Sequence, residues 1–438
     1  MKKKQFLIFI TIIVIGIILH LVNITEPKKP VFDEVYFVTF AASYVKGQPP
    51  ILDIHPPLGK LIYSVPLWFS RSSLSNENSV FLINEKIGDK IKMHKPVFKP
   101  FYDFPYLTLR LISSFFGVLL IIAVYLFVKN LTQNETAAFL AMFLITFENA
   151  LLLQTRFILL DGMYLAFGFL ALAFFFLKKP KPILAGIIFG LALSVKLIAI
   201  VFIGPIIFYF LLSDSQKRKE LKKQILLFFS AGVIIFLIVI VFANAFLIPV
   251  SERLKEYNLF FDNLLLKPKE TFPNYPIFYQ KLVPYFQAFF IEIATMITGY
   301  VYIDGSHPFS SSWHSWFLMQ KPIVYSYADN FVLIGNIFVW FLGLIAIVYA
   351  IFKKQHLVLL GSYIFALVPF MLVQRPTFLY HYFPALIFAI SLAAVIISER
   401  IALLTSKERK RFLLFIGGIV ILFFVIASPF TFGFRFIE

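Results

Sequence analysis

The segment from residue 32 to residue 60 is dense in groups that can accept or donate protons. Its sequence, FDEVYFVTFAASYVKGQPPILDIHPPLGK, contains Asp33, Glu34, Asp53, His55 and Lys60. A carboxylate can take the proton of an attacking hydroxyl, and nearby cations can stabilise a leaving group that gains negative charge. Adjacent residues of a helix diverge by about 100°, so Asp33 and Glu34 would face different surroundings. The segment therefore predicts a catalytic loop.

Long apolar runs surround this loop and must position it. Hydrophobic residues make up 60% of the 438 residues and charged residues only 14%, whereas soluble domains carry about a quarter. An ordinary soluble protein is therefore excluded, and we expect an all-α integral membrane protein. The N-terminus is basic and then apolar from Phe6 to Val22. No small-residue cleavage site follows, so we expect an uncleaved first transmembrane helix.

The apolar runs predict eleven membrane spans. They fall at 6–22, 106–128, 137–153, 158–177, two short helices within 183–212, 225–247, 331–352, 357–374, 382–398 and 412–429. The run 183–212 is too long for one span of about 20 residues, and Lys196 near its middle predicts a turn. Residues 58–69 predict a short amphipathic helix in the interface, and 70–103 are expected to form a loop.

The net charge of +17 is explained by membrane topology rather than by nucleic-acid binding. Basic residues concentrate at 129–135, 178–181, 213–224, 353–354 and 398–411. The positive-inside rule places these connections in the cytoplasm, with the N-terminus inside and the C-terminus outside. Walker and GxGxxG motifs, cysteines and an HxxxH spacing are all absent. We therefore expect no nucleic-acid partner, no metal site and no cofactor, although a divalent metal requirement stays open.

This topology brings isolated charges and histidines to the outer face, where they would cost free energy unless paired or functional. The residues are Asp33, Glu34, Asp53, His55, Lys60, Arg110, Glu148, Arg156, Asp161, Lys196, His307, Arg375 and His381. Each has a simpler explanation as well. The carboxylates could be solvated, the basic side chains could extend to the interface, Asp161 could pair with Arg156, and the histidines could be structural. Their coincidence on one face favours a shared site.

Seven motifs spread along the chain are similar to those of a known family. They are FDEVYF at 32–37, DIHPPLGK at 53–60, FPYLTLRLISSFFG at 104–117, FENALLLQTRFILLD at 147–161, LALSVKLIAIVF at 191–202, SHPFSSSW at 306–313 and RPTFLYHYFPAL at 375–386. On these motifs the chain resembles the protein O-mannosyltransferases of the GT-C superfamily. It departs from them at Tyr36, where His is usual, and at Glu148, where Asp is usual. The polar region 250–330 is too short for a β-trefoil MIR domain, which favours a small prokaryotic-type member.

The resemblance implies a GT-C fold of about 11 transmembrane helices with interfacial helices in a long first outer loop. Residues 1–250 would form the catalytic module, and 251–438 the second outer loop with four C-terminal helices. It also implies an inverting enzyme that moves mannose, or a related sugar, from a polyprenyl-phosphate donor to Ser or Thr hydroxyls of secreted or membrane proteins. The expected site is the outer face of a prokaryotic cell membrane, with the lipid-linked donor, the protein acceptor and membrane lipids as partners.

The residues take expected roles on this basis. Asp33 is the expected base, and Glu34 would orient the acceptor or the loop. The expected donor-phosphate and substrate-binding residues are Asp53, His55, Lys60, Arg110, Arg156, Asp161, Lys196, His307, Arg375 and His381. Two alternatives stay open. One is a GT-C transferase with a lipid or glycan acceptor, such as an aminoarabinose transferase. The other is a secondary transporter, which would bind its substrate near the membrane midplane.

Overall fold

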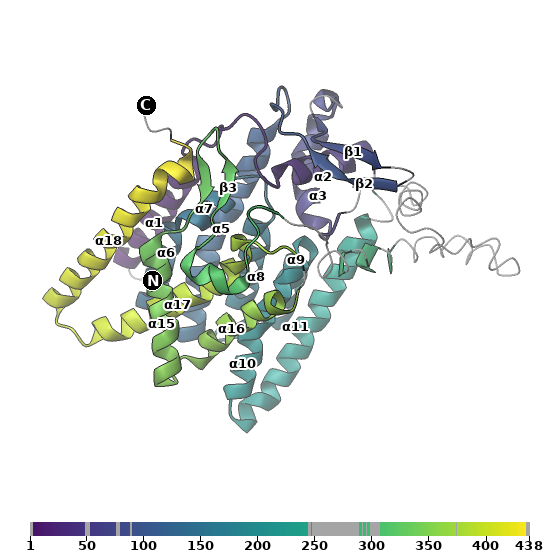
Figure 1. Cartoon of the computed structure of the whole chain (residues 1–438). Coiled ribbons are helices and arrows are strands. Elements are labelled where there is room, and N and C mark those ends of the chain that lie inside the picture. The colour runs from purple at the N-terminus through teal and green to yellow at the C-terminus, as the bar shows by residue number, and fades with distance from the viewer. Residues whose placement is uncertain are drawn as a thin grey trace, which may run out of the picture.

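The protein is largely helical. The computed structural model describes residues 3–48, 53–75, 79–87, 90–243, 247, 289–290, 292–294, 296–297, 307–373 and 375–434. Long helices form a bundle, and short helices and two hairpins gather at one end of it (Figure 1).

The first helix, α1 (Lys3–Leu21), leads into the predicted catalytic loop. That loop contains α2 (Glu34–Lys46), which ends at Gly47 in the left-handed conformation, and α3 (Leu58–Phe69), which confirms the predicted short helix. The prediction of a loop over 70–103 was wrong in part. An antiparallel hairpin of β1 (Leu82–Ile87) and β2 (Lys90–Pro96) lies there. Its signal in the sequence is the Gly-Asp dipeptide between two strand-like runs.

The central helices follow in the predicted order. They are α5 (Tyr106–Thr132), α6 (Glu135–Thr146), α7 (Asn149–Gln154), α8 (Asp161–Phe175), α9 (Pro182–Val195), the 3₁₀ helix η2 (Leu197–Ile203), α10 (Gly204–Leu212) and α11 (Ser215–Phe242). The predicted break at Lys196 is confirmed, because that residue is extended between α9 and η2. The basic stretch before 225 is helical rather than a connection. Its helix begins early because the Asp214 carboxylate accepts from the backbone N–H of Lys217.

The predicted continuous helix over 137–153 is broken at Glu148. The Glu148 carboxylate accepts from the backbone N–H of Leu151 at 2.6 Å and so begins α7. It also accepts from the Asn336 backbone and from Trp340 Nε1, at 2.9 and 2.8 Å. A buried carboxylate needs such donors, so Glu148 both interrupts the helix and joins α7 to the C-terminal half.

The C-terminal part begins with a short 3₁₀ helix and a hairpin. Its elements are η4 (Trp313–Leu318), β3 (Ile323–Ser326), β4 (Phe331–Leu333), α15 (Ile337–Lys353), α16 (Leu357–Leu372), η5 (Leu379–Tyr382), α17 (Phe383–Ala402) and α18 (Ser406–Phe432). The helix predicted from 331 begins at 337 because Asn336 caps it. Strand β4 packs against α7 and α18, so the hairpin lies at the end of the bundle where the short helices gather (Figure 1).

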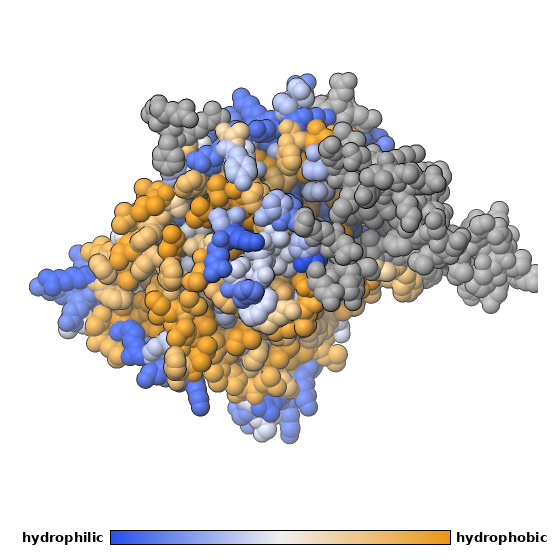
Figure 2. Space-filling view, in the orientation of Figure 1, coloured by the Kyte–Doolittle hydropathy of each residue, from blue (hydrophilic) through white to orange (hydrophobic). Residues whose placement is uncertain are grey.

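Within the described residues, five helical segments are long and apolar enough to cross a membrane. They are α1, α5, α11, residues 379–402 and α18. Helices α15 and α16 meet this test only as a pair, with a bend of 119°, while α6, α8, α9 and residues 197–212 are shorter apolar helices. Figure 2 shows a broad apolar flank, with hydrophilic residues gathered at the lower turn between α10 and α11. The protein is therefore an integral multi-pass membrane protein.

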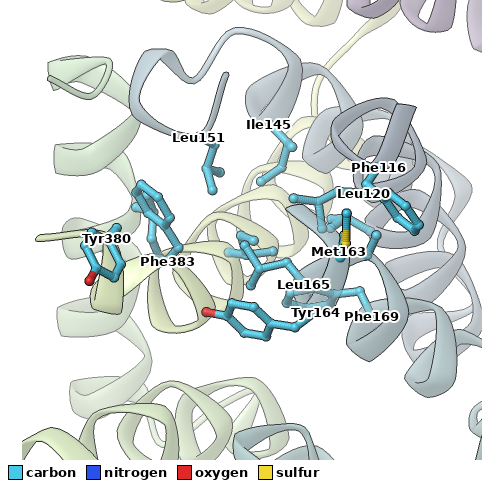
Figure 3. Close-up of a cluster of buried hydrophobic side chains, with 14 of the residues drawn as sticks. Phe116, Leu120, Ile145, Leu151, Met163, Tyr164, Leu165, Phe169, Tyr380 and Phe383 are labelled. Atoms are coloured by element: carbon cyan, nitrogen blue, oxygen red, sulfur yellow. The ribbon is translucent and has the colours of Figure 1, made fainter. Parts of the chain in front are cut away.

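A continuous apolar core lies beneath the end of the bundle that carries the short helices and hairpins. Figure 3 shows its centre, where Phe116 and Leu120 of α5 and Met163 and Phe169 of α8 face one another. Tyr380 and Phe383 approach from η5 and α17. The polar residues of the site are thus attached to a tightly packed base.

Helices α9 and α11 contact each other through glycines, which makes their packing sensitive to one methyl group. A Cβ at Gly190 would lie 2.5 Å from the Gly232 carbonyl oxygen, whereas a Cβ at Gly418 on α18 would meet nothing within 4 Å. We expect Gly190→Ala to lower the free energy of unfolding by about 1–3 kcal/mol. The control Gly418→Ala should leave it unchanged or raise it slightly. Thermal unfolding in detergent tests this, and equal shifts would contradict the packing.

Candidate active site

The two adjacent carboxylates of the catalytic loop have opposite environments. Glu34 is fully buried. Its Oε1 accepts from Arg110 Nε at 3.0 Å and from the Ile158 backbone N–H at 2.8 Å. Its Oε2 accepts from Arg110 Nη2 and from the Val31 backbone N–H, both at 2.9 Å. Glu34 is therefore a structural link between the loop, α5 and the α7–α8 connection.

Arg110 is engaged completely in holding that link. Its five N–H groups are all used. Besides Glu34, they donate to the backbone carbonyls of Ile24, Glu26 and Lys29 at 3.2, 3.1 and 3.4 Å. The guanidinium also lies 4.8 Å from the centre of the Phe157 ring. No donor is left for the phosphate contact expected from the sequence, so the geometry gives Arg110 a structural part instead.

Arg156 also lies apart from the predicted site. It is buried and donates to the backbone carbonyls of His20 at 3.3 Å, Thr431 at 2.8 Å, and Val22. These contacts join the ends of α1 and α18. They replace both the phosphate contact and the pairing with Asp161 that the sequence suggested.

Asp33 is half-buried, and within the described part of the chain its carboxylate has no hydrogen bond or ion pair. Burial raises the pKa of Asp33 from 3.8 to about 6. The positive charges of Lys196 and Arg375 oppose this rise, and the negative charge of Asp161 adds to it. Asp33 is thus available to a substrate, unlike its neighbour.

Lys196 is a buried cation held by a carboxylate partner. Its Nζ lies 3.0 Å from each oxygen of Asp161, and both side chains are buried. The rings of Tyr164 and Tyr380 lie beneath the ammonium, with centres at 5.6 and 5.3 Å. Gln154 Nε2 donates to Asp161 Oδ2 at 2.8 Å. The extended backbone between α9 and η2 therefore places the oriented Lys196 ammonium within electrostatic reach of Asp33.

Asp53 and Lys60 fix the turn that presents His55. Lys60 Nζ lies 2.6 Å from Asp53 Oδ2 and donates to the carbonyls of His55 and Pro56 at 2.5 and 2.6 Å. Burial lowers the pKa of His55, as do the charges of Lys196, Lys60, Arg375 and His381. His55 is therefore a neutral imidazole within electrostatic reach of the site, and Asp53 and Lys60 support it from behind.

His381 and His307 occupy different positions. The Nδ1 atom of buried His381 accepts from the Phe378 backbone N–H at 2.9 Å. Its neutral ring would then carry the hydrogen on Nε2, as a donor. His307 lies at the aromatic edge, 6.4 Å from the centre of the Phe32 ring, and burial lowers its pKa.

The structure therefore places Asp33, His55, Asp161, Lys196, Arg375 and His381 within electrostatic reach of one another, and keeps Glu34, Arg110 and Arg156 in supporting positions. Residues that the sequence did not single out are Phe32, Gln154, Tyr325 and Tyr380. Phe32, Gln154 and Tyr380 lie inside the quoted motifs, so the motifs offered a signal for them, whereas Tyr325 lies in a polar region without a pattern. Within the described residues, no group of three His, Asp or Glu side chains could hold a metal ion. An apolar hollow of about 400 Å³ between α10 and α11 contains none of these residues.

Comparison with known families decides the relationship. The sequence model of the dolichyl-phosphate-mannose-protein mannosyltransferase family matches residues 10–252. That range is more than half of the chain. The chain belongs to this family. A second model, of the C-terminal four-transmembrane region of protein O-mannosyltransferase, matches residues 350–437.

Family relatives and solved structures agree with this membership. Dolichyl-phosphate-mannose–protein mannosyltransferase 1 of Schizosaccharomyces pombe is 28% identical over 214 residues, covering 45% of this chain and 22% of the relative. The chain thus matches about a fifth of that relative's length. The Saccharomyces cerevisiae Pmt1–Pmt2 complex bound to the sugar donor has a TM-score of 0.74 at 14% identity, covering 100% of this chain and 91% of that one. ArnT of Cupriavidus metallidurans bound to undecaprenyl phosphate has a TM-score of 0.55 at 14% identity, covering 96% and 64%. At these identities the structures establish a shared GT-C fold.

The buried pair predicts that Glu34 acts on stability. Glu34→Gln keeps the shape but leaves the Arg110 cation buried without a carboxylate, so we expect a loss of about 3–5 kcal/mol in the free energy of unfolding. Glu135→Gln is the matched control, because Glu135 pairs with Lys129 at 3.0 Å in a partly exposed position. Its loss should stay below about 1 kcal/mol. Equal unfolding curves for the two variants would refute the structural assignment of Glu34.

Proposed function

We propose that this chain transfers mannose, or a related sugar, from a polyprenyl-phosphate donor to Ser or Thr hydroxyls of a protein acceptor. The observation that carries the proposal is the available carboxylate of Asp33 close to the oriented cation of Lys196. Family membership supports the reaction class, and the family relatives, which are dolichyl-phosphate-mannose–protein mannosyltransferases, suggest the donor and the protein acceptor.

Asp33 is the proposed general base. As the acceptor oxygen attacks the anomeric carbon, its proton moves to the Asp33 carboxylate. The phosphate oxygen leaves that carbon on the face opposite to the attack and keeps the electron pair of the broken bond. The configuration at the anomeric carbon is therefore inverted. A pKa of about 6 suits this role, since it leaves the carboxylate mostly ionised at neutral pH yet more basic than an ordinary Asp.

The leaving phosphate gains charge, so cations already in position stabilise the transition state. Lys196 and Arg375 are the proposed partners, with His381 Nε2–H as a hydrogen-bond donor. Asp161 holds Lys196 before the donor arrives, which avoids the cost of ordering a flexible side chain during the reaction. His55, Asp53, Lys60 and His307 are proposed to shape the donor site rather than to carry charge in the reaction.

The alternatives differ in the acceptor or in the kind of activity. A lipid or glycan acceptor would agree with the fold shared with ArnT, whereas the family membership supports a protein acceptor. Family membership also favours an enzyme over a secondary transporter. A transfer assay with dolichyl-phosphate-mannose and a Ser/Thr peptide, read by mass spectrometry, tests the proposal. A mass increase of one hexose is expected, and none on the same peptide with Ser and Thr replaced by Ala. Donor consumption without a modified peptide would contradict the protein acceptor.

We further propose that the site faces the outside of a prokaryotic cell membrane and that 1–250 and 251–438 form two modules. The chain has no cysteine, so Ser215→Cys and Ser310→Cys each introduce a single label position. The positive-inside rule predicts that they react from opposite sides of the membrane, with Ser215 inside. Labelling of both from one side would overturn the topology.

The proposed base predicts a pH dependence. Asp33 must be ionised to accept a proton, so transfer should be lost as pH falls through about 6 and level off above it. The charged and titratable groups that influence Asp33 are Lys196, Asp161, Arg375, Tyr36 and Tyr325. Initial rates at saturating donor measure this. Binding of dolichyl phosphate at the same pH values is the control, and a flat rate between about pH 5 and pH 8 would remove Asp33 as the base.

A further inference from the structure

Tyr325 of strand β3 is buried between the two halves of the site. It comes from the β3–β4 hairpin, which packs against α7. Its side chain contacts Phe32 in the loop after α1, Gln154 of α7 and Phe157 in the α7–α8 connection. None of the roles assigned above includes it. Its hydroxyl joins a set of hydrogen-bonded residues that holds the cation Lys196, and its ring contacts the residue next to the proposed base, Asp33.

The hydroxyl of Tyr325 is connected to the Lys196 ammonium through a series of hydrogen bonds. Tyr325 donates to the side-chain oxygen of Gln154. The amide nitrogen of Gln154 donates to Asp161 Oδ2 at 2.8 Å, and Asp161 holds Lys196 Nζ at 3.0 Å. All four side chains are buried. Because an amide offers its oxygen and nitrogen on opposite edges, the Tyr325 bond fixes which edge of Gln154 faces Asp161.

The ring of Tyr325 packs against the residue beside the proposed base, Asp33. Tyr325 stacks on Phe32 with ring centres 4.8 Å apart and an angle of 9° between the planes. Phe378, Tyr380 and His307 enclose the same Phe32 ring at 6.0, 6.0 and 6.4 Å. Phe32 has a φ of 45°, a backbone conformation that is unfavourable for a bulky residue and must be held by its surroundings. Asp33 is the next residue, so the stacked rings set the direction from which its carboxylate enters the site.

We propose that Tyr325 is a positioning residue that couples the proton acceptor to the phosphate-binding cation. This inference rests on the proposed function. The ring of Tyr325 holds Asp33 through Phe32, and its hydroxyl holds Lys196 through Gln154 and Asp161. A single side chain thus sets the separation between the group that accepts the proton and the group that receives the leaving phosphate. Small errors in such a separation reduce rates strongly.

The two contacts can be removed separately. Tyr325→Phe removes the hydroxyl and keeps the stack, whereas Phe32→Leu removes the stack and keeps the hydroxyl. We expect Tyr325→Phe to weaken binding of dolichyl phosphate about tenfold, because Gln154 loses its partner and Asp161 and Lys196 lose their orientation. Its pH inflection near 6 should stay in place. Phe32→Leu should bind dolichyl phosphate normally, lower kcat about tenfold or more, and move the inflection.

Three further variants complete the test. Tyr325→Leu should show both defects. Phe32→Tyr should keep the kcat of the wild type, because it retains the aromatic ring. Tyr327→Phe is the matched control, since Tyr327 is an exposed tyrosine of the same hairpin, and it should behave as the wild type. The measurements are equilibrium binding of dolichyl phosphate and kcat against pH, on purified full-length protein in lipid nanodiscs.

The outcomes separate the coupling from the proposed function. Unchanged binding in Tyr325→Phe, or the same pair of changes in Tyr325→Phe and Phe32→Leu, would overturn the coupling while the reaction stands. A wild-type protein that neither binds dolichyl phosphate nor transfers the sugar would contradict the proposed function itself, and the coupling with it.

Discussion

The buried ion pair between Glu34 and Arg110 is the interaction on which the rest of the site depends. Removing two charges from water costs several kcal/mol for each ion, and the attraction offsets this only when every remaining donor and acceptor is satisfied. That condition holds here, because both carboxylate oxygens accept two hydrogen bonds and all five guanidinium N–H groups donate. The pair therefore closes the loop after α1 onto α5 and the α7–α8 connection, and it fixes the backbone beside Asp33.

Two adjacent carboxylates thus acquire opposite properties from their surroundings. Glu34 is held by its partners, while Asp33 is held through its neighbours and keeps its own oxygens available. Phe32 on one side and Glu34 on the other restrain the backbone of Asp33. The base is therefore ordered although none of the described residues forms a hydrogen bond with its carboxylate, which would lower its basicity. The cations are divided in the same way. Arg110 is used up by Glu34 and backbone carbonyls, and Arg156 donates to backbone carbonyls, whereas Lys196 is held by Asp161 close to the base.

Much of the fold could be predicted from hydrophobic runs and charge. The break at Lys196 was predictable, because the run was too long for one helix and contained a buried charge. The break at Glu148 was missed because the apolar pattern continues across it, and its cause is a cap satisfied by Asn336 and Trp340, which lie far along the chain. The gathering of charged residues such as Asp33, Asp161 and Lys196 was predictable from the topology, whereas their roles in a site stay a prediction. Which arginines are structural was not predictable, because their partners are mostly backbone carbonyls that carry no sequence signal, and Tyr325 acts through contacts that only the folded chain creates.

The central claim is that the charge of Asp33 serves the chemistry and neither the fold nor donor binding. Single-turnover transfer by Asp33→Asn, at saturating dolichyl-phosphate-mannose and neutral pH, tests it most directly when donor binding and thermal unfolding are measured on the same preparation. The account predicts a rate lower by about 10²–10⁴-fold, the usual contribution of a general base, with donor affinity and unfolding temperature at least equal to those of the wild type. A transfer rate near that of the wild type in this variant would contradict the account.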